Sequence, residues 1–314
     1  MGRLVGRRLL LAIPMLFIVV TATFLLEQLI PGDPASFVLG SHTTPGQLSA
    51  FDASIGLHRS LLDQYGSQLW GVLHGNLGQS WISRQNVRHL IVTALPVTLS
   101  LAVLATVVTF ILGLGLGTLA ALRRGRWPDR ILQGVAGIGV GLPNFWLAIV
   151  LVLFFAIDTH LFPATGYVSF STSPGSWASS LVLPVVAITF GSLAGVLLQV
   201  RSSMIDVLSQ DYIRSLRANG IARRQIIFKH GLRNGAIPVV TTLGFVFVGL
   251  LAGTVVIEQV FNLPGLGSML LNGVLTHDLP VVQGVVIVFA VVVVIVNLLV
   301  DLLAAALNPR LRRA

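Results

Sequence analysis

The sequence predicts an all-α membrane protein with six transmembrane helices, because six long apolar runs divide a chain that is poor in charge. Charged residues make up 10% of the 314 residues, and the mean hydropathy is +0.89. A soluble chain carries about 25% charged residues. Each run can cross a hydrocarbon core of about 30 Å at about 1.5 Å per residue. The runs are residues 9–30, 95–122, 131–157, 181–200, 236–258 and 281–307.

The cationic residues predict the orientation of these helices. All but three of the 20 Lys and Arg precede the first run, follow the sixth, or lie between runs two and three and runs four and five. Segments 158–180 and 259–280 contain none. Since positive charge marks cytoplasmic loops, both termini and loops 123–130 and 201–235 are expected inside. The chain is therefore predicted to be a multi-pass membrane protein with both termini in the cytoplasm.

The rest of the composition excludes several classes of site. The net charge of +9 lies in loops next to the membrane and has no nucleic-acid recognition motif, so lipid headgroups and an acidic partner are the expected counterparts. There is no Cys, which excludes disulfides and thiolate metal sites. The first run extends to Ile30 without a small-residue cleavage site, which favours a retained helix over a signal peptide.

The runs and loops give an expected organisation along the chain. Residues 57–73 are expected to form one or two short amphipathic helices in an outer segment, and Gly75 to Gly78 a turn. The expected parts are an N-terminal tail with the first transmembrane helix (1–30), an extracytoplasmic region (31–94), a five-helix core with a cytoplasmic loop at 201–235 (95–307), and a cytoplasmic tail (308–314).

Glycines within the runs have two interpretations. Gly113 and Gly117 have the spacing of small residues at helix contacts, so close packing is favoured there. Gly141-Leu142-Pro143-Asn144 fits either close packing or a broken helix that lines a cavity, since irregular backbone is tolerated where protein or water covers it. The sequence leaves both open at that point.

The cytoplasmic loop 201–235 is predicted to hold two short helices. Residues 211–218 form the first, Asn219-Gly220 a turn that ends it, and residues 221–232 the second. The second carries Ile226, Ile227 and Phe228 beside basic residues. Such a segment suits a surface that docks a partner or an interfacial helix on anionic lipid, and the residues alone do not decide between them.

The sequence motifs that several kinds of catalytic or binding site require are absent from this chain. Its one lysine, Lys229, is followed by His230, so the Gly-Lys-Ser/Thr sequence of a P-loop cannot occur. If transport is driven by ATP, another polypeptide must hydrolyse it. No H-E-x-x-H or G-x-S-x-G motif is present, and the seven His are scattered, four of them in segment 31–94. No metal site is expected.

Two carboxylates fall at the outer ends of apolar runs. Glu27 ends the first run and Glu258 the fifth. Charges in a membrane are a signal of function by default. Both lie where a carboxylate is expected to reach the interface, and neither has an obvious cationic partner at its depth. A proton relay is therefore the less favoured interpretation.

With these motifs in view, the chain resembles the permeases of ABC importers, and more narrowly the first permease subunit of the dipeptide, oligopeptide and nickel family. The resemblance covers nearly the whole chain and is most specific in the cytoplasmic loop and after the fifth run. The matching stretches are 29–34, 75–80, 95–99, 143–146, 211–220, 228–234 with Pro238, and 258–267. Two departures affect single contacts: the loop lacks the Glu-Ala-Ala opening of ABC-importer permeases at large, and Asn219 replaces a frequent Lys.

The resemblance implies a type I ABC importer permease fold in a prokaryotic cytoplasmic membrane. It implies a second, similar permease as partner, two cytoplasmic ATPases that hold ATP and Mg, an external binding protein and a peptide substrate. This chain itself would hold no cofactor. The implied coupling helix comprises Tyr212, Ile213, Arg214, Leu216, Arg217, Ala218, Asn219 and Gly220. Candidate pathway or helix-break residues are Pro143, Asn144 and Trp146, and candidate outer-side residues are Glu27 and Glu258.

Other functions are less well supported by the sequence. Importers of nickel, haem or glutathione in this family look alike at this level. An ion-coupled secondary transporter predicts inverted repeats and a charged midplane site, neither of which is apparent. A channel predicts a filter motif or a charged ring, and an intramembrane enzyme a catalytic constellation.

Overall fold

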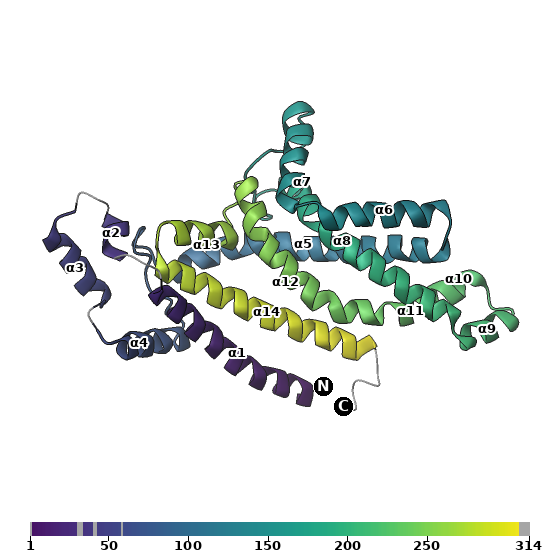
Figure 1. Cartoon of the computed structure of the whole chain (residues 1–314), viewed down its shortest axis with the longest axis horizontal. Coiled ribbons are helices and arrows are strands. Elements are labelled where there is room, and N and C mark those ends of the chain that lie inside the picture. Colours follow the sequence, from purple (N-terminus) through teal and green to yellow (C-terminus); the bar gives the residue numbers. More distant parts are fainter. Residues whose placement is uncertain (1, 30–33, 40–42, 58, 308–314) are drawn as a thin grey trace. The chain divides into compact units, whose positions relative to one another are not determined.

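The computed structural model describes residues 2–29, 34–39, 43–57 and 59–307, and this part of the chain is almost entirely helical (Figure 1). Besides helices and turns it holds one isolated β-bridge, between Gln79 and Asn86. The predictions for residues 30–33, for His42 and His58 and for the tail 308–314 lie outside the described residues. The predicted all-α class is confirmed.

Among the described residues, five helices are long and apolar enough to cross a membrane. Their long apolar sequences satisfy every backbone group within the segment, as the bilayer requires. They correspond to runs one, two, four, five and six. They are α1 (Gly2–Gln28), α5 (Val87–Leu122), α8 (Pro174–Ser209), α12 (Ile237–Val260) and α14 (Leu279–Leu307).

The third run is a broken helix. α6 (Trp127–Gly141) and α7 (Asn144–Leu151), which the π-helix η1 (Val152–Asp158) continues, are bent by 103°. Leu142 and Pro143 between them are extended, because a proline disfavours the helical conformation in the residue before it and offers no N–H. The count is six spans if this pair is one span. A continuous helix over 131–157 is thus wrong. The break is present, and the cavity that it would line stays a prediction.

Two helices extend beyond the runs into predicted loops. α5 begins at Val87, so the last eight residues of segment 31–94 are helical, and the Asn86 Oδ1 accepts a 2.9 Å hydrogen bond from the Arg88 N–H near this start. α8 continues to Ser209, so the first nine residues of loop 201–235 are also helical. Hydropathy alone missed these ends because charged, histidine or hydroxyl side chains interrupt their apolar residues.

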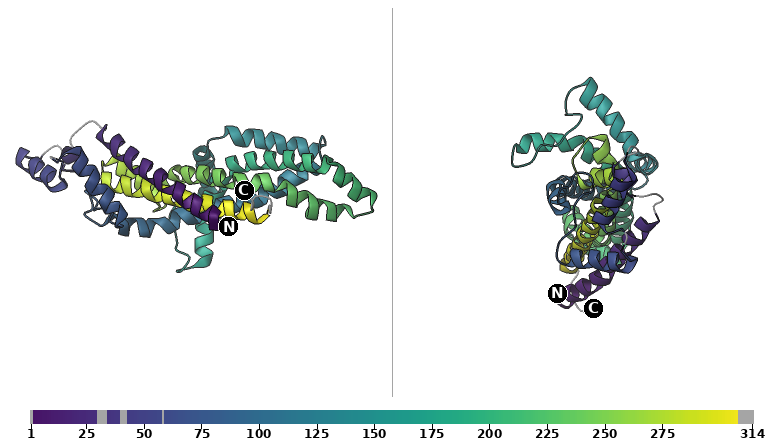
Figure 2. Two further views of the ribbon diagram at one scale, coloured as in Figure 1. Left: turned by 90° about the horizontal axis from the view of Figure 1, so that it is seen from below. Right: turned by 90° about the vertical axis from the view of Figure 1, so that its left-hand side faces the viewer.

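The chain divides into two compact units. One holds Thr98–Leu263 and the chain from Val296 onward, and the other holds Gly2–Val97 and Pro264–Ile295. In the first unit α6 and α8 run side by side (Figures 1 and 2), and α12 also packs on α8.

Glycines let α5 approach α8 closely in this unit. A Cβ at Gly117 would lie 2.6 Å from Val200 Cβ, and one at Gly113 would lie 2.5 Å from Val196 Cγ1. Val196 and Val200 are buried. Close packing at these two glycines is therefore confirmed, and we call residues 113–122 of α5 together with α6 and α8 the packed stem.

The second unit contains four further helices. They are α2 (Pro34–Leu39), α3 (Pro45–Ile55), α4 (Leu61–Leu73) and α13 (Leu266–Leu275). α4 lies within the predicted 57–73, and Ser60 caps it by accepting a 3.2 Å hydrogen bond from the Asp63 N–H. No sequence pattern predicted α2, α3 or α13. Val87, Ile91, Leu266, Val281 and Val285 form a buried apolar cluster here.

The turn predicted at residues 75–78 is present. Gly75 has φ 72° and Gly78 has φ 81°, a left-handed conformation that glycine adopts without steric cost. Just beyond it, buried Ser80 donates a hydrogen bond to Asp278 Oδ2, and the Trp81 N–H donates to Asp278 Oδ1 at 3.0 Å. These bonds connect the end of the turn to the loop that follows α13.

Candidate coupling site, helix break and buried carboxylates

α9 (Asp211–Ala218) is a short helix with one buried side chain, as an amphipathic sequence predicts. Ile213 is 0% exposed, and Leu216 is half-buried. The other candidate residues of the helix are exposed: Tyr212, Arg214, Arg217 and Ala218. One apolar residue thus anchors the helix while a broad polar face stays free for a partner.

The turn after α9 has the predicted conformation. Gly220 has φ 74°, its N–H donates to the Arg217 carbonyl at 3.1 Å, and the Ile221 N–H donates to the Leu216 carbonyl at 3.2 Å. Asn219 and Gly220 are exposed, and a Cβ at Gly220 would meet nothing within 4 Å. The restriction on residue 220 is therefore conformational rather than steric. We call residues 211–221 the α9 turn.

The second part of the loop is more irregular than predicted. Ile221 and Ala222 are not helical, and α10 (Arg223–Gln225) leads into the π-helix η2 (Ile226–Gly231) and then α11 (Leu232–Gly235). Ile226 and Ile227 are buried, whereas Phe228 is 62% exposed. The Arg224 guanidinium lies 6.0 Å from the Phe228 ring centroid, so this end presents a cationic and aromatic surface.

Specific contacts connect the α9 turn and α11 to the stem. Asn234 donates a 2.9 Å hydrogen bond to the Tyr212 hydroxyl, and Ser203 of α8 donates one to the Gly235 carbonyl at 2.9 Å. Met204 is fully buried, and a Cβ at Gly235 would lie 2.8 Å from its Sδ. The glycine thus lets α11 pack on α8, and these contacts connect the α9 turn to a transmembrane helix.

A cleft of about 550 Å³ lies between α5, α8 and the loop. Its walls are mainly apolar, and three arginines contribute to it, Arg124, Arg217 and Arg223. Two of these belong to the predicted coupling loop. An acidic group on a partner surface suits this combination of charge and apolar area.

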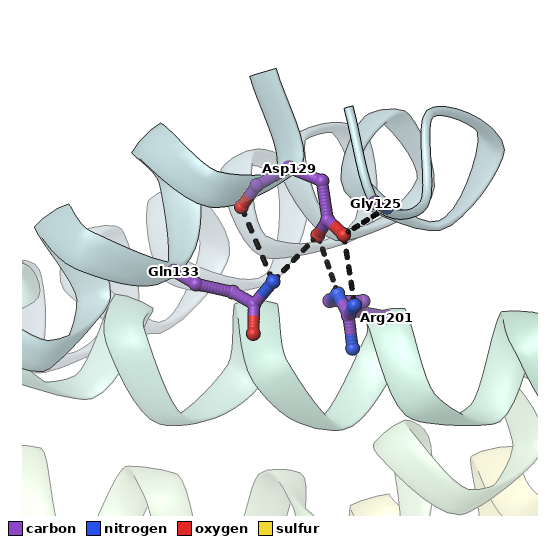
Figure 3. A network of polar contacts seen from close by, with 4 residues as sticks. All are labelled: Gly125, Asp129, Gln133 and Arg201. Atoms are coloured by element: carbon purple, nitrogen blue, oxygen red, sulfur yellow. Dashed lines mark hydrogen bonds and ion pairs between the residues drawn. The ribbon is translucent and has the colours of Figure 1, made fainter. Parts of the chain in front are cut away.

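The packed stem contains a bidentate ion pair that the sequence analysis did not identify. Arg201 Nε lies 2.6 Å from Asp129 Oδ1 and its Nη2 2.9 Å from Oδ2, while the Gly125 N–H and Gln133 Nε2 donate to the same carboxylate at 2.8 and 3.0 Å (Figure 3). Asp129 is 1% exposed. In the sequence Arg201 is one of many cytoplasmic charges, and no local signal pairs it with a residue 72 positions away.

The three candidate pathway residues surround the helix break. Pro143 and Trp146 are exposed, and Asn144 is half-buried. A Cβ added to Gly191 of α8 would lie 3.2 Å from Asn144 Oδ1. A Cβ added to Gly253 of α12 would lie 3.8 Å from Asn144 Nδ2. The amide therefore lies against two glycine surfaces, and a role in a pathway stays a prediction.

The two candidate outer-side carboxylates are buried, so the expectation that they reach the interface is wrong within this chain. Glu258 is 0% exposed and accepts a 2.6 Å hydrogen bond from the Thr98 hydroxyl. Glu27 is 8% exposed and accepts a hydrogen bond from Gln283. Each has a neutral partner from a segment distant in sequence, which sequence spacing could not show.

Comparison with known proteins identifies the class. The model of the family described as "Binding-protein-dependent transport system inner membrane component" matches residues 113–313, and that of the N-terminal part of such membrane components matches residues 1–102. The chain belongs to this family, and it is a permease subunit of an ABC importer. As an inner membrane component it is a bacterial multi-pass membrane protein.

Relatives align with the chain over nearly its whole length. It is 39% identical over 312 residues to a protein of Brucella abortus strain 2308 provisionally named a peptide transport system permease, covering 99% of each. It is 37% identical over 308 residues to the glutathione transport system permease protein GsiC of Escherichia coli O6:H1, covering 98% of this chain and 97% of that one.

A solved structure supports the fold. A chain of the MetNI methionine ABC transporter in an inward-facing conformation aligns with a TM-score of 0.58 at 18% identity, covering 70% of this chain and 96% of that chain. At this identity the likeness shows the fold alone. The type I ABC importer permease-like class expected from the sequence is thereby confirmed.

Proposed function

We propose that this chain is one of two permease subunits of an importer that moves short peptides across the cytoplasmic membrane by alternating access. The near-full-length similarity to permeases named for peptide and glutathione transport carries this proposal. Glutathione is itself a tripeptide, so both names agree on the chemical class. They favour peptide over the nickel and haem alternatives.

In this proposal the energy comes from other subunits. The chain has a single lysine, which cannot form a P-loop, so two cytoplasmic ATPase subunits or domains bind ATP and Mg and this chain is not an enzyme. An external binding protein delivers the peptide. A second, homologous permease completes the pathway at the interface of the two.

The α9 turn is the proposed coupling element. Ile213 anchors it, the Tyr212–Asn234 hydrogen bond holds it to α11, and its polar face is exposed. A groove on one ATPase would receive this face. Closure of the ATPases on ATP would move the turn, and the contacts of Ser203 and Met204 with Gly235 would transmit that movement to α8.

Lipid docking of the loop is the competing role, because exposed Phe228 and its basic neighbours suit an anionic membrane surface. The two roles predict different sensitivities. A helix in a groove loses function when its shape changes, whereas an interfacial helix tolerates a valine and responds mainly to loss of Arg214, Arg217, Arg223 and Arg224.

Gly220→Val in the reconstituted complex tests the coupling role. The valine strains a left-handed position by about 1 kcal/mol or more, so we expect normal insertion and assembly but loss of dipeptide uptake and of ATP hydrolysis stimulated by the binding protein. Ala218→Glu, which places a charge on the exposed end of α9, should have the same effect.

Gly166→Val is the matched control. Gly166 also has a positive φ, 93°, and open space around its Cβ position, but it lies in the segment predicted outside. It should leave the response of ATP hydrolysis to the binding protein intact. Wild-type uptake and stimulation in Gly220→Val, with assembly unchanged, would show that this loop does not couple the subunits.

A further inference from the structure

A second cavity, of about 310 Å³, lies within the unit formed by Gly2–Val97 and Pro264–Ile295. The end of α1, described residues on and around α4, and the start of α14 line it. These segments are all predicted to lie at the outer side of the membrane, where substrate arrives. Its size lies at the lower end of the range for small-molecule sites.

Two residues that line the cavity, Glu27 and Gln68, each have a buried polar atom that lacks a hydrogen-bond partner among the described residues. Glu27 accepts a hydrogen bond from Gln283 through Oε2, but within the described residues its Oε1 has no hydrogen-bond partner, and neither has Gln68 Nε2. Both residues line the cavity, and Glu27 is more than nine-tenths buried. Buried polar groups are nearly always satisfied, so an unused acceptor and an unused donor on residues that line the same cavity point to a ligand.

The charges on the wall define the kind of ligand. Among the described residues that line the cavity, Glu27 is the one carboxylate and Arg59 the one guanidinium. Gln64 fixes the backbone around Arg59 by donating to the carbonyls of Leu57 and Arg59 at 3.1 and 3.0 Å. One negative and one positive group, together with the amide donor of Gln68, complement a molecule that itself carries one charge of each sign.

We propose that this cavity, the Glu27 cavity, binds a small zwitterion, whose primary ammonium donates to Glu27 Oε1 and whose anionic group pairs with Arg59. Gln68 Nε2 donates to a carbonyl or anionic oxygen of the same molecule. Two sources have this chemistry, a free short peptide and the headgroup of phosphatidylethanolamine. The peptide source rests on the proposed function, whereas the site itself does not.

Binding of dialanine to the purified full chain, in nanodiscs of phosphatidylglycerol, tests the ammonium contact. N-acetyl-dialanine, which lacks the ammonium, should bind about tenfold more weakly than dialanine, the effect of one charge-assisted hydrogen bond. Glu27→Gln should weaken dialanine by a similar factor and remove the difference between the two ligands. Asp63→Asn, an exposed carboxylate on α4 outside the cavity, should leave both affinities unchanged.

The anionic contact is tested with dialanine amide, which lacks the carboxylate. The wild-type chain should prefer dialanine to its amide, and Arg59→Gln should abolish that preference while retaining the preference for a free ammonium. Because the wild-type ligand series needs no substitution, the proposal can fail even if a variant does not fold. Equal affinity for dialanine and its N-acetyl form, or binding of neither dialanine nor glycerophosphoethanolamine, would overturn it.

Glycerophosphoethanolamine separates the two sources. If it displaces dialanine or binds in its place, with the same sensitivity to Glu27→Gln, the cavity is a site for the lipid headgroup. If it does not compete, the occupant is the peptide. Uptake by the full complex is a separate measurement: lost binding with normal dipeptide uptake would overturn this site alone, and retained binding without dipeptide uptake would overturn only the proposed function.

Discussion

The packed stem and the α9 turn are built from the same kinds of residue, glycine and arginine, but use them in opposite ways. In the stem, a Cβ at Gly117 would overlap Val200, and Arg201 is paired with buried Asp129. In the turn, Gly220 has open space around it, and Arg214 forms an ion pair in which both side chains are mostly exposed.

This difference separates stability from coupling. Substitutions in the stem should act on the folded chain itself, because they disturb close contacts and a buried charge. Substitutions in the α9 turn should leave the isolated chain folded and act on the assembled importer, because few of its side chains touch the rest of the chain. Two stability measurements and one labelling experiment test this division.

The largest expected effect is that of Asp129→Ala. Removal of the carboxylate leaves the Arg201 guanidinium, whose side chain is 20% exposed, without its bidentate partner, and also frees the Gly125 N–H and the Gln133 amide. We expect the free energy of unfolding in detergent to fall by about 2–3 kcal/mol, measured by thermal or denaturant unfolding.

Arg214→Ala is the matched control for that ion pair. The Asp211–Arg214 pair joins residues three positions apart at 3.3 Å, with side chains that are 94% and 74% exposed. Exposed pairs of this kind contribute little to stability, so no measurable change is expected. Equal destabilisation by the two substitutions would show that the turn is as much a part of the folded core as the stem is.

A smaller loss is expected from Gly117→Val. The added side chain overlaps Val200 and the Leu197 carbonyl of α8, and overpacking of this kind costs about 1–3 kcal/mol. Gly115→Val on the same helix is the control, because Gly115 is exposed and a Cβ there meets nothing within 4 Å. If both variants unfold at the wild-type temperature, α5 and α8 are not in close contact in solution.

Local sequence signals predicted the features that depend on local physics. Hydropathy located the spans, since any chain that crosses lipid must bury its own backbone polar groups. Glycine chemistry predicted the turn at Gly220, which has a positive φ, and Pro143 marked a point where a broken helix was one of two interpretations. The helix ends were less accurate, because α5 and α8 extend through segments in which polar residues interrupt the apolar ones.

Pairings over long sequence distances could not be predicted in this way. Glu258 bonds to Thr98, 160 positions away, and Asp129 to Arg201. Each partner is an ordinary residue in its own segment, and only the folded chain brings them together. For the same reason the buried position of Glu27 and its cavity had no signal in the sequence beyond a carboxylate at the end of an apolar run.

The smallest expected effect is on stability, which cysteine substitutions at exposed positions should leave unchanged. These substitutions report the side of the membrane that the α9 turn faces. The native chain has no Cys, and Ser171, Ser215 and Asn272 are all exposed, so reactivity of a cysteine at each reports access from one side. In intact cells Ser171→Cys and Asn272→Cys should react with an impermeant maleimide, and Ser215→Cys should react only after permeabilisation, because the cationic loops lie inside. Labelling of Ser215→Cys in intact cells would place the turn outside, where no ATPase can reach it. It could then not couple ATP hydrolysis to transport, whatever its shape.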